Sequence, residues 1–304
     1  MRRRRTTTVI ITLLTHLLWL IVLQSTSAWP DVEVESREYK AMLDALHFHE
    51  IPPCQTSSPK IDSLIPPLRA LATSVSAKPS GSFSLKDGMP RIVEYYDTPG
   101  DCLLQNNHWI LRRRQKHPQS TWQGTLKTRH GDRYHSTFRR KKMNECCADC
   151  VDGGGKFEED INLLWHSVFS YSHKCDMNES SSMTKFRDIS DYWIEMKEVF
   201  ADLNWSLDTP LQKVGDLTVT ECVYEGFTID FDEGGKQEVG DFSLTLWYDS
   251  PHAPSPSVAE LSFTIKSVGN KLEDWNKATI MRAHDFWDQV ERYVMNDVRM
   301  RIVS

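Results

Sequence analysis

The chain has 304 residues, of which 39% are apolar, 26% charged and 10% aromatic. This composition excludes a disordered, collagen-like or coiled-coil protein and is typical of a globular protein with one large domain or two small ones. A chain of this length buries a core large enough to fold unaided. It carries 36 Lys and Arg against 42 Asp and Glu, and this balance does not indicate nonspecific nucleic-acid binding.

The N-terminus has the pattern of a secretory signal peptide. Four arginines, Arg2 to Arg5, precede an apolar run from Val9 to Leu23, and small residues follow as far as Ala28. A membrane anchor is the alternative, but about fifteen apolar residues fall short of the roughly 20 that a spanning helix needs. We therefore expect residues 1–28 to be removed. Residues 29–304 then form one secreted domain, extracellular or in the lumen of the secretory pathway, with no membrane contact.

The seven cysteines are expected to form disulfides, because thiols in an oxidising compartment usually pair. Zinc binding by the cluster Cys146, Cys147 and Cys150 is the alternative, but no matching pair of histidines supports it. The odd total leaves at least one cysteine free or joined to another chain by an intermolecular disulfide. Sequons at Asn178 and Asn204 predict that both asparagines lie on exposed loops and carry glycans.

Most segments of the mature chain alternate apolar and polar residues, as strands do when one face packs on a core and the other is polar. About eight strands suffice for a closed barrel, and closure removes exposed edges. We predict a mainly β (α+β) fold, a closed antiparallel eight-stranded barrel with flanking helices. The predicted strands are Val32–Arg37, Arg91–Tyr96, Trp109–Arg114, Trp122–Arg129, Asp216–Val223, Gly226–Asp232, Asp241–Tyr248 and Val258–Lys266.

Three helices are expected beside the barrel: Glu38–Phe48, Ile61–Val75 and Leu272–Ile302. Pro66 and Pro67 break the start of the second. The third has a broad apolar stripe at helical spacing, which favours packing against the barrel over binding to a membrane. Segments 76–88, 142–155 and 173–188 are expected to be loops, and the last of them is expected to be an insertion.

Charged side chains share one face of several predicted strands. A period of two places Glu33, Glu35 and Arg37 together, with the two carboxylates about 7 Å apart, close enough to converge on one divalent cation. A solvated strand face is the alternative for this segment alone. Arg112 and Arg114 also share a face, and further basic residues follow at Lys127, Arg129 and Arg139.

Cations stacked in this way repel one another unless an anion lies between them. If the strands close with their charged faces inward, the lumen combines Arg and Lys, which suit phosphate oxygens, with carboxylates, which suit Mg²⁺ or Mn²⁺.

The order of these motifs resembles that of the CYTH-type triphosphate tunnel metalloenzymes. Six segments, spread over about 230 residues, match the family's pattern in its expected order. Glu33-Val-Glu35-Ser-Arg37 is similar to the ExExK signature, Tyr95-Tyr-Asp-Thr-Pro99 to the Tyr-Phe-Asp-Thr-Pro turn, Leu111-Arg-Arg-Arg114 to the Leu-Arg-x-Arg strand, Thr125-Leu-Lys127 to the Thr-Leu-Lys strand, Lys156-Phe-Glu158-Glu-Asp160 to the later basic-x-Glu-x-acid element, and Glu260-Leu-Ser-Phe263 to the terminal strand with an inward Glu.

The resemblance implies a closed barrel whose tunnel binds a triphosphate, which many members hydrolyse with a divalent metal such as Mg²⁺ or Mn²⁺. It implies that Glu33 and Glu35 hold the metal with Glu158 or Glu260, and that Glu35 orients the attacking water. It also implies that a set of basic residues binds phosphate oxygens and spreads the charge of the departing phosphate, with Arg37 and Lys127 the closest to catalysis. This set is Arg37, Arg112, Arg114, Lys127, Arg139 and Lys156.

The sequence departs from the family pattern in three places. Arg37 stands where the signature has a lysine, and arginine cannot give up its proton as lysine can. Thr220-Glu221-Cys222 stands where family members carry an arginine, so one phosphate ligand is missing. The Cys-rich insertion before Lys156 leaves the register of Glu158 against Glu159 open.

Three functions remain open from the sequence. The first is a secreted, metal-dependent hydrolase of inorganic triphosphate, a nucleoside triphosphate or another polyphosphorylated substrate. The second is a non-catalytic module that keeps the tunnel and binds polyphosphate or an organic phosphate. The third is a disulfide-braced, glycosylated interaction protein whose charged faces meet solvent. The first two have a small-molecule partner, and none has nucleic acid as a partner.

Overall fold

The structure is a computed structural model, and it describes residues 34–116, 121–133, 135–136, 155–177, 183–193, 196–216, 218–231, 239–266 and 276–296. The chain divides into two compact units, Met1–Val32 and Glu33–Ser304, and the described residues belong to the second. The predicted signal peptide, the cluster Cys146–Cys150 and the sequon at Asn178 lie outside the described residues.

Strands dominate the described residues. They are β1 (Ser36–Leu43), β2 (Lys78–Ser80), β3 (Ser84–Leu85), β4 (Arg91–Asp97), β5 (Trp109–Lys116), β6 (Trp122–His130), β7 (Lys156–Asn162), β8 (His166–Met177), β9 (Gln212–Lys213), β10 (Val219–Asp230), β11 (Val239–Tyr248) and β12 (Val258–Lys266). The α-helices are α2 (Pro59–Asp62), α3 (Ile65–Ser74), α4 (Leu103–Asn106), α6 (Phe186–Tyr192), α7 (Met196–Asp202) and α8 (Lys277–Asn296). Short 3₁₀ turns are η1 (Ala45–Phe48), η2 (Lys86–Gly88), η3 (Leu163–Trp165) and η4 (Val214–Asp216).

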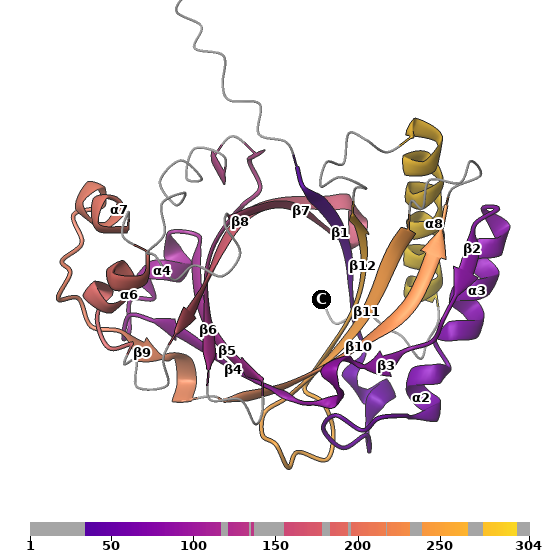
Figure 1. Cartoon of the computed structure of the whole chain (residues 1–304), viewed down its shortest axis with the longest axis horizontal. Helices are drawn as coiled ribbons and strands as arrows, with labels where there is room; N and C mark the ends of the chain where they lie inside the picture. Colours follow the sequence, from indigo (N-terminus) through magenta and orange to yellow (C-terminus); the bar gives the residue numbers. More distant parts are fainter. Residues whose placement is uncertain are drawn as a thin grey trace, which may run out of the picture. The chain divides into compact units, whose positions relative to one another are not determined.

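Nine of the described strands close into a barrel (Figure 1). Their order is β10-β11-β12-β1-β7-β8-β6-β5-β4, and β4 pairs again with β10. The short strands β2 and β3 pair with β10, and β9 pairs with β4. Neighbours in the ring are antiparallel except β1 and β7, which are parallel. A ring with an odd number of strands needs a parallel pair, because strictly alternating directions cannot close.

The barrel is therefore mixed and nine-stranded, where the sequence predicted eight antiparallel strands. The predicted strands at 216–223 and 226–232 form one strand, β10, which a register shift between Glu225 and Thr228 interrupts without ending. The strands β7 and β8 complete the ring. β8 extends into the start of the insertion predicted at 173–188. Its polar residues Ser172 and Lys174 face the interior of the barrel, whereas the prediction placed this polar segment in a solvated loop.

The helix predicted at Glu38–Phe48 is wrong, because strand β1 covers most of this segment. Tyr39, Ala41 and Leu43 are buried and alternate with Lys40 and other residues of the opposite face, which is the period of a strand. The ring of Tyr39 packs on Phe263 and Trp287, with centroid distances of 5.9 and 5.4 Å.

The main apolar core lies on the outer side of the barrel, where β1, β10, β11 and β12 pack against α3 and α8. The prolines that follow Ile65 occupy the first turn of α3, where a missing N–H costs nothing. The apolar stripe predicted on the C-terminal helix is confirmed within α8, where five of its members are buried. They are Ala283, Phe286, Trp287, Val290 and Val294. None of the described helices is long and apolar enough to cross a membrane.

The structure has a disulfide that joins Cys54 to Cys222 of β10; the sequence predicted disulfides but left this pairing open. It closes a loop with a sequence separation of 168 residues. Asn204 of the second sequon is exposed, as predicted, and its glycosylation stays a prediction.

Candidate functional site

The barrel encloses a cavity of about 460 Å³, to which all nine strands of the ring contribute side chains. The strands place most of their apolar residues outside, so their alternate residues, which are mostly polar, face this tunnel. Among the described residues, eight lining side chains are Lys or Arg and four are Glu. The cations are Lys40, Arg91, Arg112, Arg114, Lys127, Arg129, Lys156 and Lys174, and the carboxylates are Glu38, Glu158, Glu221 and Glu260.

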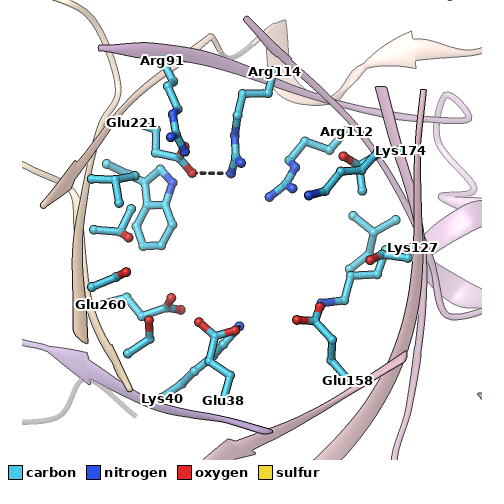
Figure 2. A pocket seen from close by; sticks show the side chains of 18 of the residues that line it. Glu38, Lys40, Arg91, Arg112, Arg114, Lys127, Glu158, Lys174, Glu221 and Glu260 are labelled. Carbon is cyan, nitrogen blue, oxygen red and sulfur yellow. Dashed lines mark hydrogen bonds and ion pairs between the residues drawn. The ribbon is translucent and has the colours of Figure 1, made fainter. Parts of the chain in front are cut away.

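Six of the residues predicted from the sequence line this tunnel, and most of them are visible in Figure 2. They are Arg112, Arg114, Lys127, Lys156, Glu158 and Glu260. The structure thus brings predicted phosphate ligands and two predicted metal ligands into one cavity. Glu33 and Arg139 lie outside the described residues.

Glu35 and Arg37 do not line the tunnel, which differs from the sequence prediction. Glu35 precedes β1, and its Oε1 accepts a hydrogen bond of 3.2 Å from the amide of Phe157. Arg37 forms an ion pair of 2.7 Å with Glu159, which also lies outside the tunnel lining. In the sequence, the apolar residues before Ser36 stand at even-numbered positions, whereas the buried apolar residues after it stand at odd-numbered positions. A change of one residue in the alternation exchanges the two faces of the strand.

Glu38 and Lys40 line the tunnel in place of the predicted Glu35 and Arg37. In this register Ser36, Glu38 and Lys40 share one face of β1. The hydroxyl of Ser36 donates a hydrogen bond of 3.0 Å to Glu158. The signal that identifies the register is the alternation of Glu38 and Lys40 with buried Tyr39 and its apolar neighbours.

Lys40 lies among carboxylates. Its Nζ is 3.0 Å from Glu38 Oε2 and 3.4 Å from Asp160 Oδ1. Burial by itself lowers the pKa of Lys40, but Glu38, Asp160 and Glu260 together raise it above its ordinary value. Lys40 therefore stays charged and neutralises the acidic side of the tunnel.

Asp160 is the centre of a second ion-pair cluster and is only 1% exposed. It contacts Arg129 at 2.8 Å and Lys127 at 3.5 Å, in addition to Lys40. Burial by itself raises the pKa of Asp160, and the surrounding cations lower it by more, so its pKa lies below the usual value. Burial is also the main cause that lowers the pKa of Lys127, which the two nearby carboxylates only partly offset.

Glu158 is held by lysines on both sides. Lys156 Nζ lies 2.5 Å from its Oε1, and Lys127 Nζ lies 3.9 Å from its Oε2. Burial raises the pKa of Glu158, but Lys127 and Lys156 outweigh burial and lower it. This carboxylate is therefore ionised and is already paired within the protein.

Glu221 of β10 is bound by two arginines from the strands β4 and β5. Arg114 donates a hydrogen bond of 2.7 Å to Glu221 Oε1, and Arg91 Nη1 lies 3.6 Å from Oε2 (Figure 2). Glu221 is only 3% exposed. Burial and the neighbouring charge of Arg112 lower the pKa of Arg114 to about 10, although Glu221 acts in the opposite direction.

Arg112 differs from these cations. In the described part of the chain its side chain has no hydrogen-bond or ion-pair partner, and its buried Nε is unsatisfied. Figure 2 shows its guanidinium directed into the tunnel, close to the guanidinium of Arg114 and the ammonium group of Lys174. A part-buried guanidinium without a partner is stabilised more by an anionic ligand than a cation that is already paired within the protein.

Six charged tunnel residues were not assigned a role from the sequence: Glu38, Lys40, Arg91, Arg129, Lys174 and Glu221. Arg91 is the first residue of a predicted strand, and the alternation pattern does not show which face the terminal residue of a strand occupies. Lys174 lay in a segment predicted to be a polar insertion. Glu221 drew attention only because the family pattern has an arginine near this position.

The tunnel carboxylates do not fit a metal held by the protein. Among the described residues, no group of three His, Cys, Asp or Glu side chains is placed to bind a metal ion. Glu38 and Glu158 are each paired with lysine, and Figure 2 shows Glu158 and Glu260 on different sides of the tunnel. Burial, with Glu38 and Asp160, raises the pKa of Glu260, which disfavours the ionised form that a hard cation needs.

No protein-family model and no curated protein matches the chain. Solved structures that it resembles include a proposed adenylyl cyclase from Hippeastrum with a dominant triphosphatase activity, at 10% identity and a TM-score of 0.39 over 84% of this chain and 86% of that one. Another is a proposed adenylate cyclase from Bacillus halodurans, at 12% identity and a TM-score of 0.37 over 88% of this chain and 92% of that one. Likenesses this distant assign no role to any residue. The closed barrel with its inward charged side chains is a feature of this chain's own structure.

Proposed function

We propose that the tunnel binds a triphosphate or a similar polyphosphorylated small molecule. The observation that supports this proposal is the surplus of positive charge, since lining cations outnumber lining carboxylates by eight to four among the described residues. Part-buried cations without a counter-charge cost free energy, and phosphoryl oxygens supply that charge through charge-assisted hydrogen bonds. Enclosure within a cavity of about 460 Å³ favours a small molecule over nucleic acid.

Titration of inorganic tripolyphosphate into the purified protein by calorimetry tests this proposal. We expect Arg112→Ala to weaken binding by roughly tenfold or more, since a hydrogen bond to a charged group contributes about 1.5–3 kcal/mol. Arg112→Ala combined with Lys127→Ala should abolish it, and added salt should weaken binding by the parent protein. Arg292→Ala is the control, because Arg292 lies on the exposed side of α8 with its side chain 73% exposed. Absence of binding, or an equal loss in the control, contradicts the proposal.

Hydrolysis of the bound triphosphate, with Mg²⁺ or Mn²⁺ present, is the second candidate function. It is favoured by the presence of Glu38 and Glu260 in the same tunnel as the cations, because a carboxylate beside a bound phosphate can orient a water molecule. Phosphate release from tripolyphosphate, with each metal and with a chelator, tests this candidate against Glu38→Gln and Glu260→Gln variants. If the parent protein binds tripolyphosphate but releases no more phosphate than the variants do, the tunnel is a non-catalytic binding module.

We also propose that this binding takes place outside the cell or in the lumen of the secretory pathway. The proposal rests on the signal-peptide pattern that ends at Ala28. Expression of the full chain in cultured cells, followed by N-terminal sequencing of the protein in the medium, tests it. Retention of the chain inside the cell with residues 1–28 intact contradicts it.

A further inference from the structure

Three histidines gather at one end of the barrel, outside the lining of the tunnel. His108 precedes β5, His130 is the last residue of β6, and His135 lies in the segment that follows β6. The rings of His130 and His135 stack with their centroids 4.1 Å apart, and the ring of His108 lies edge-on to them, at 4.9 and 6.4 Å. The antiparallel pairing of β5 with β6 assembles this cluster, because it places the start of one strand beside the end of the other (Figure 1).

A second cavity, which we call the histidine cavity, lies beside this cluster and has a volume of about 270 Å³. Its polar lining consists of Gln105, His108, Arg129 and His130. Most of the other lining side chains are apolar, and one of them, Ile110, lines the tunnel as well, as does Arg129. The two cavities therefore adjoin. Apolar walls lower the local dielectric constant, which strengthens the attraction between Arg129 and an anion in the histidine cavity.

Arg129 keeps a hydrogen-bond donor that no protein group uses. Its Nη2 binds Asp160 at 2.8 Å, but Asp160 also pairs with Lys40 and Lys127, so it compensates the charge of Arg129 only in part. The Nε of Arg129 is buried and has no hydrogen-bond partner among the described residues. A buried N–H without an acceptor costs free energy, and an oxyanion in contact with it recovers that cost.

The hydrogen bonding of His130 links the cluster to pH. The backbone N–H of Asp132 donates a hydrogen bond of 2.9 Å to His130 Nδ1, so Nδ1 carries no proton and the ring is neutral in this arrangement. Histidine is the side chain that ordinarily gains its charge between pH 8 and 5. A proton on Nδ1 turns this acceptor into a donor and releases the amide of Asp132. Histidinium ions this close to one another and to Arg129 repel unless an anion lies between them.

Positive charge prevails around the cluster once the histidines are protonated. Within the described residues, β6 carries Arg129, and the segment after it carries Asp132 and Arg133. Asp160 of β7 reaches this side of the barrel through its ion pair with Arg129. The helix α4 and the strand β8 contribute only uncharged side chains to the histidine cavity. Two carboxylates thus stand against two arginines and, at low pH, three histidinium ions.

We propose that the histidine cavity is a binding site for a small inorganic oxyanion, such as sulfate or phosphate, which fills when the histidines are protonated. His108, His130 and Arg129 donate hydrogen bonds to the anion, and the released amide of Asp132 is a further donor. His135 stacks on His130 and adds charge without lining the cavity. Proton and anion binding are reciprocal, so each raises the affinity for the other. The inference goes beyond the proposed function, because none of the three histidines lines the tunnel.

Sulfate is the probe, because it stays a dianion throughout the range in which histidine titrates. It is titrated into the purified protein with isotope-labelled histidines, at about pH 5.5 and about pH 8 and at constant ionic strength, while NMR follows the imidazole signals. His108→Asn, His130→Asn and His135→Asn assign these signals. Sulfate should bind roughly 5- to 150-fold more tightly at the lower pH, the usual range of coupling between two ligands.

His130→Asn should remove this pH dependence, because asparagine still accepts the amide of Asp132 but takes up no proton. His49→Asn is the matched control, since the His49 side chain is 54% exposed and lines neither cavity. Arg112→Ala should leave the response of the cluster within about twofold, because Arg112 lines the tunnel and not the histidine cavity.

Equal sulfate affinity of the parent protein at the two pH values overturns the inference, and this comparison needs no variant to fold. Loss of the imidazole response in Arg112→Ala also overturns it, because that result places the anion in the tunnel. If tripolyphosphate does not bind but the histidines respond to sulfate at low pH, the proposed function falls and this inference stands. Urea unfolding at both pH values establishes that the barrel is folded before titration.

Discussion

Arg37 and Glu159 form an ion pair of 2.7 Å outside the tunnel, although both residues directly adjoin side chains that reach the tunnel ion-pair clusters. Glu38, the next residue after Arg37, lines the tunnel and binds Lys40. Arg37 is therefore expected to contribute to stability, and its neighbour Glu38 to the tunnel site.

Arg37→Ala is expected to lower the free energy of unfolding by about 1–3 kcal/mol, because Glu159, with its side chain only 11% exposed, loses a charged partner. Tripolyphosphate affinity should stay within about twofold of the parent value, since Arg37 does not reach the ligand. Urea unfolding and calorimetric titration measure the two effects. Glu38→Gln is the counterpart: it releases Lys40 and should strengthen tripolyphosphate binding. Loss of binding in Arg37→Ala contradicts the outer placement of this residue.

Substitutions of the neighbouring arginines Arg112 and Arg114 should have opposite effects on the ligand-free protein. Arg114→Ala removes a hydrogen bond from buried Glu221 and should cost about 1–3 kcal/mol of unfolding free energy. Arg112→Ala removes no partner within the described part of the chain and relieves repulsion with Arg114, so stability should be unchanged or higher. Urea unfolding without phosphate measures both. Equal destabilisation by the two substitutions shows that Arg112 has a structural partner.

Asp160→Asn is expected to lower the unfolding free energy by about 3–5 kcal/mol near neutral pH, because the part-buried Lys40 and Lys127 lose their shared carboxylate. The cations hold the pKa of Asp160 below 3.8, its ordinary value. A carboxyl with a lowered folded pKa stabilises the fold above its unfolded pKa, and this contribution disappears as pH falls through the folded value. The difference between parent and variant should therefore be full above about pH 5 and shrink below about pH 4.

Urea unfolding across this pH range measures the effect of Asp160→Asn. Asp208→Asn is the matched control. The Asp208 side chain is 61% exposed and forms its ion pairs at the surface, so its substitution should change stability little. A difference between parent and Asp160→Asn that stays constant with pH contradicts the ionised state of Asp160.

Reduction of the disulfide between Cys54 and Cys222 should lower Tm, because the bond closes a long loop in the unfolded chain. The expected loss in unfolding free energy is about 2–5 kcal/mol. Thermal unfolding with and without a thiol reductant measures it, and a variant with both Cys54→Ala and Cys222→Ala should show no further change on reduction. An equal shift in that variant assigns the effect to other cysteines.

The alternation of apolar and polar residues in β5, β6, β11 and β12 was enough to predict their strands and the shared inward face of Arg112, Arg114 and Lys127, whereas the inward direction of Glu260 was implied only by the family resemblance. The same reasoning failed at β1, where alternation predicts two faces but does not say which face continues past an irregular start. Buried Tyr39 settles the question, and its burial depends on Phe263 and Trp287, which are more than 200 residues away in the chain.

The sequence by itself determined a mainly β domain, its C-terminal helix, and an unusual number of cations on the faces that strands turn away from their apolar core. Only the tertiary structure decided the parallel pairing of β1 with β7, the ninth strand, and which charges meet: Lys40 with Glu38, and Arg91 and Arg114 with Glu221. The reason is physical. Local periodicity depends on near neighbours, whereas barrel closure and charge compensation depend on contacts between strands far apart in the chain.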